Sequence, residues 1–220
     1  MPQLNTTIHL DMLKNFQRSN RLLPRLYRCL KREFFAGNIY GLQWGDPDLI
    51  EPLKFIRDRF VLPYVNPEGY GVEIGPGGGR WTRYLLGFRK LYVIDYYPEV
   101  LEELRKNFKK PNMEFINNHG TDFPGIRERS IDYVFSFGTF VHLDLNLIEA
   151  YLINVKHILK PGANAVIHYS DKRKIMAQRL KGFSENTPEK MRAMVSCAGF
   201  RIVEEDLTTM WHSSIIRFTT

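Results

Sequence analysis

A short apolar segment that runs directly into a glycine-rich turn constrains this chain more than any other feature. Residues 70–74 form an apolar run that contains Glu73, and such a run is typical of a buried parallel strand. The glycines between positions 75 and 79 permit positive φ angles and a close approach of the backbone to a ligand. A helical pattern resumes from Trp81 to Gly87. The sequence therefore predicts a strand, a ligand-binding turn and a helix, in that order.

The spacing of the glycines excludes two common nucleotide sites. A dinucleotide fingerprint that begins with Gly75 and Gly77 needs its third glycine at position 80, where the chain has Arg80. A phosphate-binding P-loop needs a lysine followed by Ser or Thr after its last glycine, and this position is again Arg80. The carboxylate of Glu73, two residues before the first glycine, suits a cationic ligand without phosphates instead.

A second acidic residue lies at the end of the next apolar strand. Residues 91–96 form this strand, and Asp95 near its end lies twenty positions beyond Gly75. A doubly wound fold places a carboxylate at close to this spacing, where it accepts hydrogen bonds from both ribose hydroxyls. Asp95 also fits as the N-cap of a helix that starts near Pro98, and the two roles are compatible.

The pattern of one acidic residue and alternating glycines closely resembles motif I of the class I S-adenosylmethionine-dependent methyltransferases. The resemblance implies an α/β fold with a doubly wound, mostly parallel seven-stranded sheet, which is Rossmann-like, and S-adenosyl-L-methionine as cofactor. It implies S-adenosyl-L-homocysteine as the product. Glu73 then faces the ammonium of the bound cofactor, and the turn leaves room for its methionine and ribose portions. The turn residues are Gly75, Pro76, Gly77 and Gly79.

Two later segments extend the resemblance. Residues 117–123 are similar to the family segment in which an acid binds the adenine amino group, so Asp122 takes that role and Phe123 packs against the ring. An Asx-type turn at Asp122 is the alternative. Residues 131–137 resemble the strand that follows the cofactor segments, and its end contributes Ser136 and Phe137. Tyr96, beside the ribose carboxylate, completes the predicted cofactor site.

The loop 138–144 is expected between the cofactor sulfonium and the methyl acceptor. His142 in this loop is the predicted general base, because an imidazole titrates near neutral pH and Asp144 is near enough in sequence to orient it. The alternative is that His142 bonds a backbone carbonyl and shapes the loop. Predicted acceptor contacts are Tyr40, Trp44 and Tyr169, with Trp44 either a flap over the site or a simple packing residue.

The other elements are expected from periodicity and caps. Asp46 is the predicted cap of a helix whose apolar stripe runs from Ile50 to Phe60. A helix over 145–160 is stopped by Pro161 and Gly162 and leads into a strand over 165–170. The basic run 171–174 that follows is interpreted as a solvated face. Further elements are expected as helices over 99–109 and from 187, and strands over 113–117, 199–203 and 214–218.

Length and composition fit one α/β domain with an extension. The chain has 220 residues, of which 44% are hydrophobic and 25% charged. We expect an N-terminal helical extension over 1–66 and a cofactor-binding core over 67–220. With no apolar run of membrane-span length and no secretory start, the expected location is cytoplasmic. The two cysteines have no paired spacing, so no metal site is expected.

The net charge of +7 leaves the methyl acceptor open. Residues 21–32 predict a two-faced helix with arginines on one side, which suits a solvated edge, an anionic acceptor, a membrane surface or RNA. A small metabolite, accepting the methyl on O, N or C, is the preferred acceptor because the sequence has no base-flipping motif or added recognition domain. The alternatives are an RNA or protein methyltransferase, and a nonenzymatic cofactor-binding or RNA-binding module.

Overall fold

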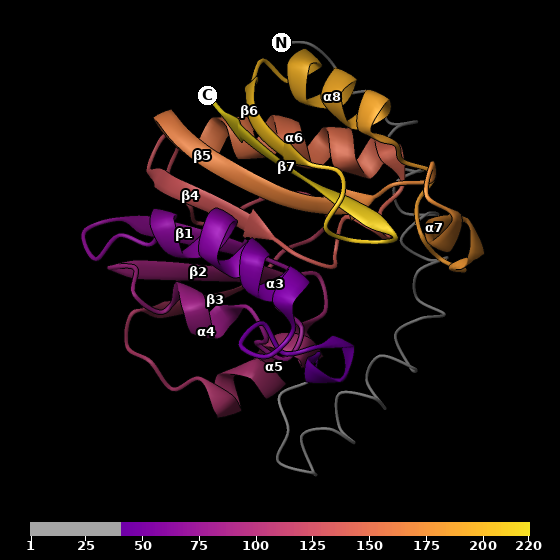
Figure 1. Ribbon diagram of the computed structural model, residues 1–220. Coiled ribbons are helices and arrows are strands. Elements are labelled where there is room, and N and C mark those ends of the chain that lie inside the picture. The colour runs from indigo at the N-terminus through magenta and orange to yellow at the C-terminus, as the bar shows by residue number, and fades with distance from the viewer. Residues whose placement is uncertain (1–40) are drawn as a thin grey trace.

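The computed structural model describes residues 41–220, and a twisted seven-stranded sheet forms its centre (Figure 1). The strand order is β3-β2-β1-β4-β5-β7-β6, and β7 is the strand that runs antiparallel to its neighbours. This is the predicted doubly wound, mostly parallel sheet. The helix expected over 21–32 and Tyr40 lie outside the described residues. The strands are β1 Tyr70–Ile74, β2 Lys90–Asp95, β3 Met113–Asn117, β4 Ile131–Ser136, β5 Leu159–Ser170, β6 Arg201–Asp206 and β7 Ser213–Thr219.

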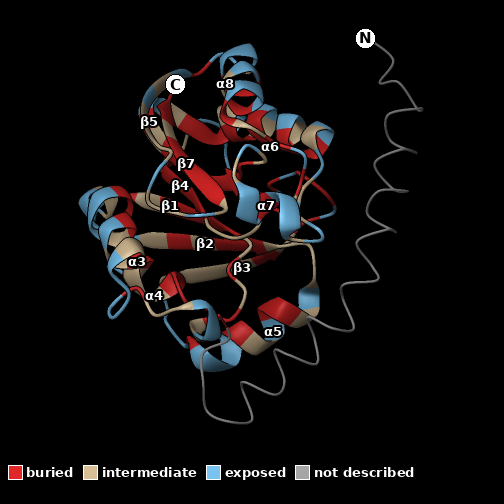
Figure 2. Ribbon diagram, turned by 45° about the vertical axis from the view of Figure 1, so that its right-hand side comes forward, coloured by how far each residue is buried: buried red, intermediate tan, exposed pale blue. Residues whose placement is uncertain are grey.

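Helices cover both faces of the sheet, and Figure 2 shows buried residues along the strands and on the inner sides of the helices. One core layer lies between the sheet and α6 and α8, and the other contains residues of α3, α4 and α5. Residues 53–61, which belong to the predicted extension, pack into the second layer. The helices are α3 Glu51–Ile56, α4 Thr82–Leu85, α5 Pro98–Asn107, α6 Leu145–Ile158, α7 Ile175–Arg179 and α8 Pro188–Cys197, with short helical turns η1 Leu42–Trp44, η2 Arg57–Val61 and η3 Leu62–Tyr64.

The boundary between α6 and β5 differs from the prediction. The helix ends at Ile158, and Pro161 and Gly162 lie within β5 instead of ending the helix. The register between β4 and β5 shifts in this region, from Ile131 opposite Leu159 to Tyr133 opposite Asn164. Pro161 fits in this irregular part of β5 because its nitrogen carries no hydrogen, and the irregular pairing does not need a hydrogen bond from that position to the neighbouring strand.

The expected cap at Asp46 was also wrong. Helix α3 begins at Glu51 with Ile50 in the N-cap position and Pro in its first turn. The side chain of Asp46 instead accepts a hydrogen bond from the amide of Asp48 and pairs with Arg83. Asp46 therefore connects this segment to α4. Among residues 41–220, no helix is long and apolar enough to cross a membrane.

The strand order places a ligand edge between β1 and β4. These two strands are neighbours in the sheet, with Val72 opposite Val134. The chain leaves β1 toward β2 on one side and leaves β4 toward β5 on the other. In open α/β sheets the loops separate at such a switch point and leave room for a ligand beyond the carboxyl ends of the strands.

Candidate functional site

The glycine turn after β1 touches the loop after β4. Gly75 has a φ of 69° and Gly77 one of 55°, both in the left-handed region that favours glycine. A Cβ at Gly75 would overlap the side chain of Thr139, whose hydroxyl approaches the carbonyls of Ile74 and Gly75. Gly75 and Gly77 remain partly exposed. The turn therefore presents open backbone at the point where the two loops meet.

Gly79 has a different role in the same turn. Its φ is 95°, it is buried, and a Cβ there would overlap Phe108 and Leu104. Its amide donates to the carbonyl of the buried Pro76 at 3.1 Å. Gly79 thus allows the turn to pack on α5, while Gly75 and Gly77 face outward.

Glu73 lies at the end of β1 with 2% of its surface exposed. One carboxylate oxygen accepts a hydrogen bond from the Thr82 hydroxyl at 2.6 Å. Burial raises the pKa of Glu73 to about 8, the Thr82 bond opposes this shift, and the charge of Asp95 adds to it. The buried carboxyl fits a cationic cofactor group, because a nearby positive charge stabilises its ionised form.

Asp95 ends β2 and is partly buried. One carboxylate oxygen accepts the amide of Tyr97 at 2.9 Å, and Tyr96 packs edge-on against the Tyr97 ring. Burial raises the pKa of Asp95 to about 7, against the effect of hydrogen bonds from the Tyr97 and Tyr96 amides. The N-cap of α5 is Tyr97, so the capping alternative for Asp95 was wrong. The ribose contact stays a prediction.

The predicted adenine segment forms a turn closed by Asp122. Its carboxylate accepts the amide of His119 at 2.9 Å and is exposed. Phe123 is only 8% exposed and packs edge-on against Tyr151 in the core. Asn118 holds the turn through the carbonyl of Gly120 at 2.9 Å. Only a small part of Phe123 is therefore accessible to a ligand ring, and the adenine contacts of both residues stay predictions.

The end of β4 connects the glycine turn after β1 with the loop after β4. Ser136 is fully buried and donates to the carbonyl of Ile74 at 2.9 Å, which ties β4 to β1. Phe137 is partly exposed and stacks on His168, with the ring centroids 3.9 Å apart and the planes 6° from parallel. Trp81 contacts the same phenyl ring with the centroids 4.6 Å apart. Phe137 is thus a ring at the switch point, whereas Ser136 is structural.

His142 bonds a backbone carbonyl, which was one of the two interpretations. Its Nδ1 lies 2.9 Å from the carbonyl oxygen of Gly182, so Nδ1 carries the proton and Nε2 is left as an acceptor. Partial desolvation by the adjacent loops lowers the pKa of His142, and the Gly182 carbonyl opposes that shift. The expected orientation by Asp144 was wrong, because the bond to Gly182 orients the ring and His142 makes no hydrogen bond to Asp144 in the described part of the chain.

The sequence did not identify a series of rings that leads away from His142. Phe183 lies edge-on to His142 and to His212, with centroid distances of 5.3 and 5.4 Å. His212 lies 6.2 Å from His168, which stacks on Phe137. We call these five residues the ring series. They come from three separate loops and from β5, and the pairing of β5 with both β4 and β7 brings strands that carry or flank these residues together.

His168 holds the centre of the ring series in place. Its Nδ1 accepts the amide of Gly138 at 3.1 Å, and Nε2 therefore donates to the Ser213 hydroxyl at 2.5 Å. Burial lowers the pKa of His168 well below its usual value, and the charges of His212, Arg80, His142 and Lys174 act in the same direction. His168 is therefore neutral.

Two of the predicted acceptor contacts, Tyr169 and Trp44, lie in opposite environments. Tyr169 is fully buried in the core, so it offers no surface to an acceptor. Successive side chains of a strand point to opposite faces, and the neighbouring His168, itself buried, packs against Phe137 in the loop after β4. Trp44 is 61% exposed at the end of η1.

The basic run after β5 is not a solvated face. Asp171 is fully buried and accepts the Ser214 hydroxyl at 2.9 Å. The side chains of Lys172 and Lys174 are only 15% and 18% exposed. Arg173 alone of the run is exposed, and the other three residues are largely buried where the chain leaves β5 beside the start of β7.

Comparison with known proteins agrees with this architecture. Residues 72–162 match the sequence model of a family described as a methyltransferase domain. The N-methyltransferase NodS of Bradyrhizobium japonicum WM9, solved with S-adenosyl-L-homocysteine, has a TM-score of 0.66 at 17% identity, over 89% of this chain and 98% of its own. No protein with a curated description matches the chain in sequence.

Two further solved structures have the same fold. A methyltransferase of Aquifex aeolicus that depends on S-adenosylmethionine has a TM-score of 0.58 at 17% identity, over 79% of this chain and 92% of its own. A Haloferax volcanii protein described as a putative methyltransferase, in complex with the activator Trm112, has a TM-score of 0.64 at 16% identity, over 82% and 94%. The fold is that of these solved methyltransferases, and residues 72–162, which include the glycine turn and the end of β4, match a methyltransferase domain.

Proposed function

We propose that this enzyme transfers a methyl group from S-adenosyl-L-methionine to an O, N or C atom of a small metabolite. The observation that carries the proposal is the ring series, whose rings come from three loops and from β5 and which we assign to the acceptor side of the site. Phe183 and His212 are both partly exposed there. Ligand sites for small molecules are mostly apolar and aromatic, with a few placed polar groups.

The cofactor contributes an electrophilic methyl group when it is bound. Glu73 and Asp95 lie at the carboxyl ends of neighbouring strands, and we assign them to its ammonium and its ribose. The exposed backbone at Gly75 and Gly77 gives it close access to the turn. Tyr96, directly after β2, and Asp122 and Phe123, in the loop after β3, complete the proposed cofactor site.

His142 is the proposed general base. Its proton on Nδ1 is held by the Gly182 carbonyl, so the lone pair on Nε2 is available. When the acceptor atom attacks the methyl carbon, the new bond to carbon forms as the carbon–sulfur bond breaks, and its electrons go to sulfur. Nε2 takes the proton that the acceptor atom loses. An acceptor that has no proton to lose needs only alignment and desolvation.

The test is methyl transfer from the labelled cofactor into a cell extract separated into small metabolites, RNA and protein. We expect label in the small-metabolite fraction with the wild-type enzyme. A His142→Ala variant should lose this label, and a His157→Ala variant should keep it, because His157 is exposed at the far end of α6. Label in RNA or protein alone would reject a small acceptor, and label in no fraction would reject the transferase activity.

A further inference from the structure

The hairpin between β6 and β7 ends in a tip, residues 207–212, and hydrogen bonds from the side chain of Lys174 anchor this tip. The Lys174 ammonium donates to the carbonyls of Met210 at 2.8 Å and Ser213 at 2.6 Å, which flank Trp211 and His212. The carboxylate of Asp206 fixes the start of the tip through the amides of Thr208 and Thr209, at 2.9 and 3.0 Å. The tip is therefore held in one conformation, and the Lys174 ammonium lies against the backbone carbonyls on either side of Trp211 and His212.

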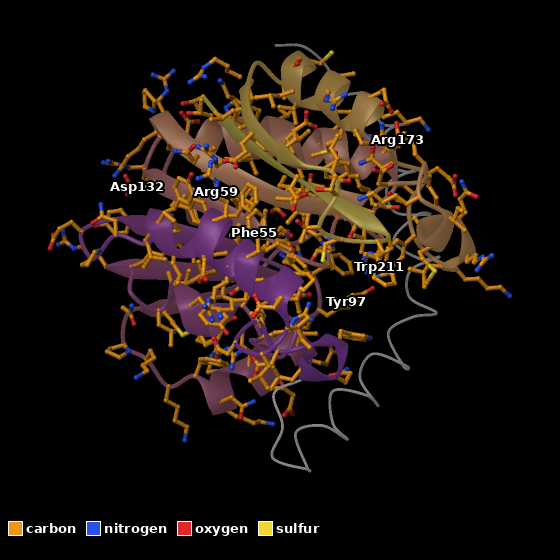
Figure 3. The ribbon with its side chains drawn as sticks, in the orientation of Figure 1. Phe55, Arg59, Tyr97, Asp132, Arg173 and Trp211 are labelled. Atoms are coloured by element: carbon orange, nitrogen blue, oxygen red, sulfur yellow. The ribbon has the colours of Figure 1, made fainter. Side chains whose placement is uncertain are left out.

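The tip presents one indole and one imidazole. Trp211 is 77% exposed, and Figure 3 places it at the end of the hairpin, beside α7. An exposed tryptophan on an anchored turn is a preformed surface for a planar group, because it needs little ordering on binding. His212, the next residue, belongs to the ring series through its contacts with Phe183 and His168. The tip is therefore continuous with the acceptor side of the site.

The His212 imidazole has a polar atom without a partner. Its Nδ1 is buried and makes no hydrogen bond to any of the residues that the structure describes. A buried polar atom left without a hydrogen bond is unfavourable, so a ligand group that bonds it is stabilised. Burial lowers the pKa of His212, and the charge of Lys174 lowers it further. His212 is thus neutral near pH 7, and Lys174 supplies the positive charge.

The balance of charge around His212 favours an anion. The charges that act most strongly on the neighbouring His168 are all cationic or imidazole groups. The acids that act on Lys174 are Asp171 and Asp206. Asp171 lies 3.9 Å from the Lys174 ammonium but is mainly bonded to Arg173 and Ser214, and Asp206 is bonded to the amides of the tip.

We propose that the hairpin tip recognises an acceptor that has a planar ring and one anionic group. The ring lies on Trp211, and the anionic group, a carboxylate or a phosphate, accepts a hydrogen bond from His212 and is attracted by Lys174. This inference rests on the proposed function and narrows its acceptor class. Trp211 and His212 are then specificity-determining residues of the methyl-transfer site.

Binding of simple probes tests the tip without the true acceptor. Benzoate, phenyl phosphate and the neutral benzyl alcohol are titrated into the enzyme saturated with S-adenosyl-L-homocysteine. The indole N–H resonance of Trp211, assigned by its loss in Trp211→Ala, reports binding. We expect benzoate or phenyl phosphate to shift this resonance with about tenfold higher affinity than benzyl alcohol, which is a difference of about 1.4 kcal/mol. The two anions separate a carboxylate site from a phosphate site.

Two histidine variants complete the experiment. His212→Gln should remove the preference for the anionic probe, whereas His157→Gln should leave it intact. Equal affinity for benzyl alcohol and the anions would overturn the inference, and so would the absence of any shift at Trp211. Loss of the preference in both variants would also overturn it. These results are independent of the labelled-methyl experiment, where methylation of RNA or protein alone would reject the proposed function itself.

Discussion

Two carboxyl groups with raised pKa values, the buried Glu73 and the partly buried Asp95, belong to the proposed cofactor site. Glu73 is the last but one residue of β1 and Asp95 is the last residue of the neighbouring β2, and Ile74 pairs with Ile94 between them. Desolvation raises the pKa of Glu73 to about 8 and that of Asp95 to about 7, and the charge of Asp95 adds to the shift of Glu73. At neutral pH Glu73 is therefore mostly protonated until a cationic ligand favours its ionised form. We infer that cofactor binding releases a proton here.

The first prediction concerns Glu73 and the stability of the free protein. A carboxyl whose pKa is raised from 4.5 to about 8 stabilises the fold fully below pH 4.5, and that stabilisation is lost as the pH rises through about 8. Between these values the wild type should lose roughly 1.4 kcal/mol per pH unit more than Glu73→Gln, which keeps an acceptor for Thr82. Urea unfolding from pH 5 to 9 measures this difference. Glu102→Gln, at an exposed position of α5, is the control. Parallel curves for the wild type and Glu73→Gln would contradict the assignment.

The second prediction concerns Asp95 and the ribose. Asp95→Ala should weaken binding of S-adenosyl-L-homocysteine by about 1.5–3 kcal/mol, because charge-assisted hydrogen bonds to the ribose are lost. Asp95→Asn should retain part of the affinity. Calorimetry on folded variants measures the change, with Asp58→Asn as an exposed control that pairs with Arg57. Unchanged affinity in Asp95→Ala would remove the ribose role.

At the scale of the elements, the contact between the turn after β1 and the loop after β4 decides the third prediction. Gly75→Ala places a methyl group against Thr139 and keeps a φ of 69°. Gly162→Ala meets a similar φ of 76° with no atom within 4 Å, so it isolates the cost of φ, about 1–2 kcal/mol. Denaturant unfolding should find Gly75→Ala the less stable of the two variants. Gly75→Ala combined with Thr139→Gly should recover part of the loss. Equal losses in the two single variants would exclude the contact.

The fourth prediction concerns the loop that carries His142. His142→Ala should keep cofactor affinity and lose turnover by about 10²–10⁴-fold with an acceptor that must lose a proton. Because the pKa of His142 is lowered, the wild-type rate should fall only as the pH drops below about 6.5, where the base becomes protonated. This acid limb should be missing in the variant. Initial rates at saturating acceptor from pH 5 to 8 measure both effects, and near wild-type turnover in His142→Ala would leave positioning as the source of catalysis.

The sequence predicted elements better than contacts between elements. Residues 113–117 form the expected strand without any shift, and the glycine spacing located the turn, because these are local patterns. The face of β5 that turns toward the loop after β4 depends on strand pairing, which the local sequence does not show. The sequence therefore led to Tyr169, which is buried in the core, whereas its neighbour His168 stacks on Phe137. The orientation of His142 by Gly182 joins residues forty positions apart, and no sequence period indicates such a bond.

At the scale of the whole molecule, Arg80 connects the cofactor turn to the segment before the core. It occupies the position where a dinucleotide site has its third glycine, and its guanidinium donates to the carbonyls of Gly41 and Gly45. It also lies over the Phe137 ring, 5.3 Å from its centroid. This side chain, with 9% exposed, stands where a dinucleotide site needs a glycine for its tight packing. We therefore expect the turn to disfavour a dinucleotide.

The last prediction is that the folded protein selects S-adenosyl-L-methionine and S-adenosyl-L-homocysteine over NAD. A ligand that binds only the native state at one hundred times its Kd adds about 2.7 kcal/mol to the free energy of unfolding. For a domain of this size each kcal/mol moves the melting temperature by about 2–4 °C, so S-adenosyl-L-homocysteine at that excess should raise it by about 5–10 °C. NAD at the same concentration should leave it unchanged. Asp95→Ala at the same ligand concentration should give a clearly smaller shift with S-adenosyl-L-homocysteine, which separates binding at the site from a general solvent effect. A shift with NAD and none with the two methionine-derived ligands would contradict the roles given to Glu73 and Arg80.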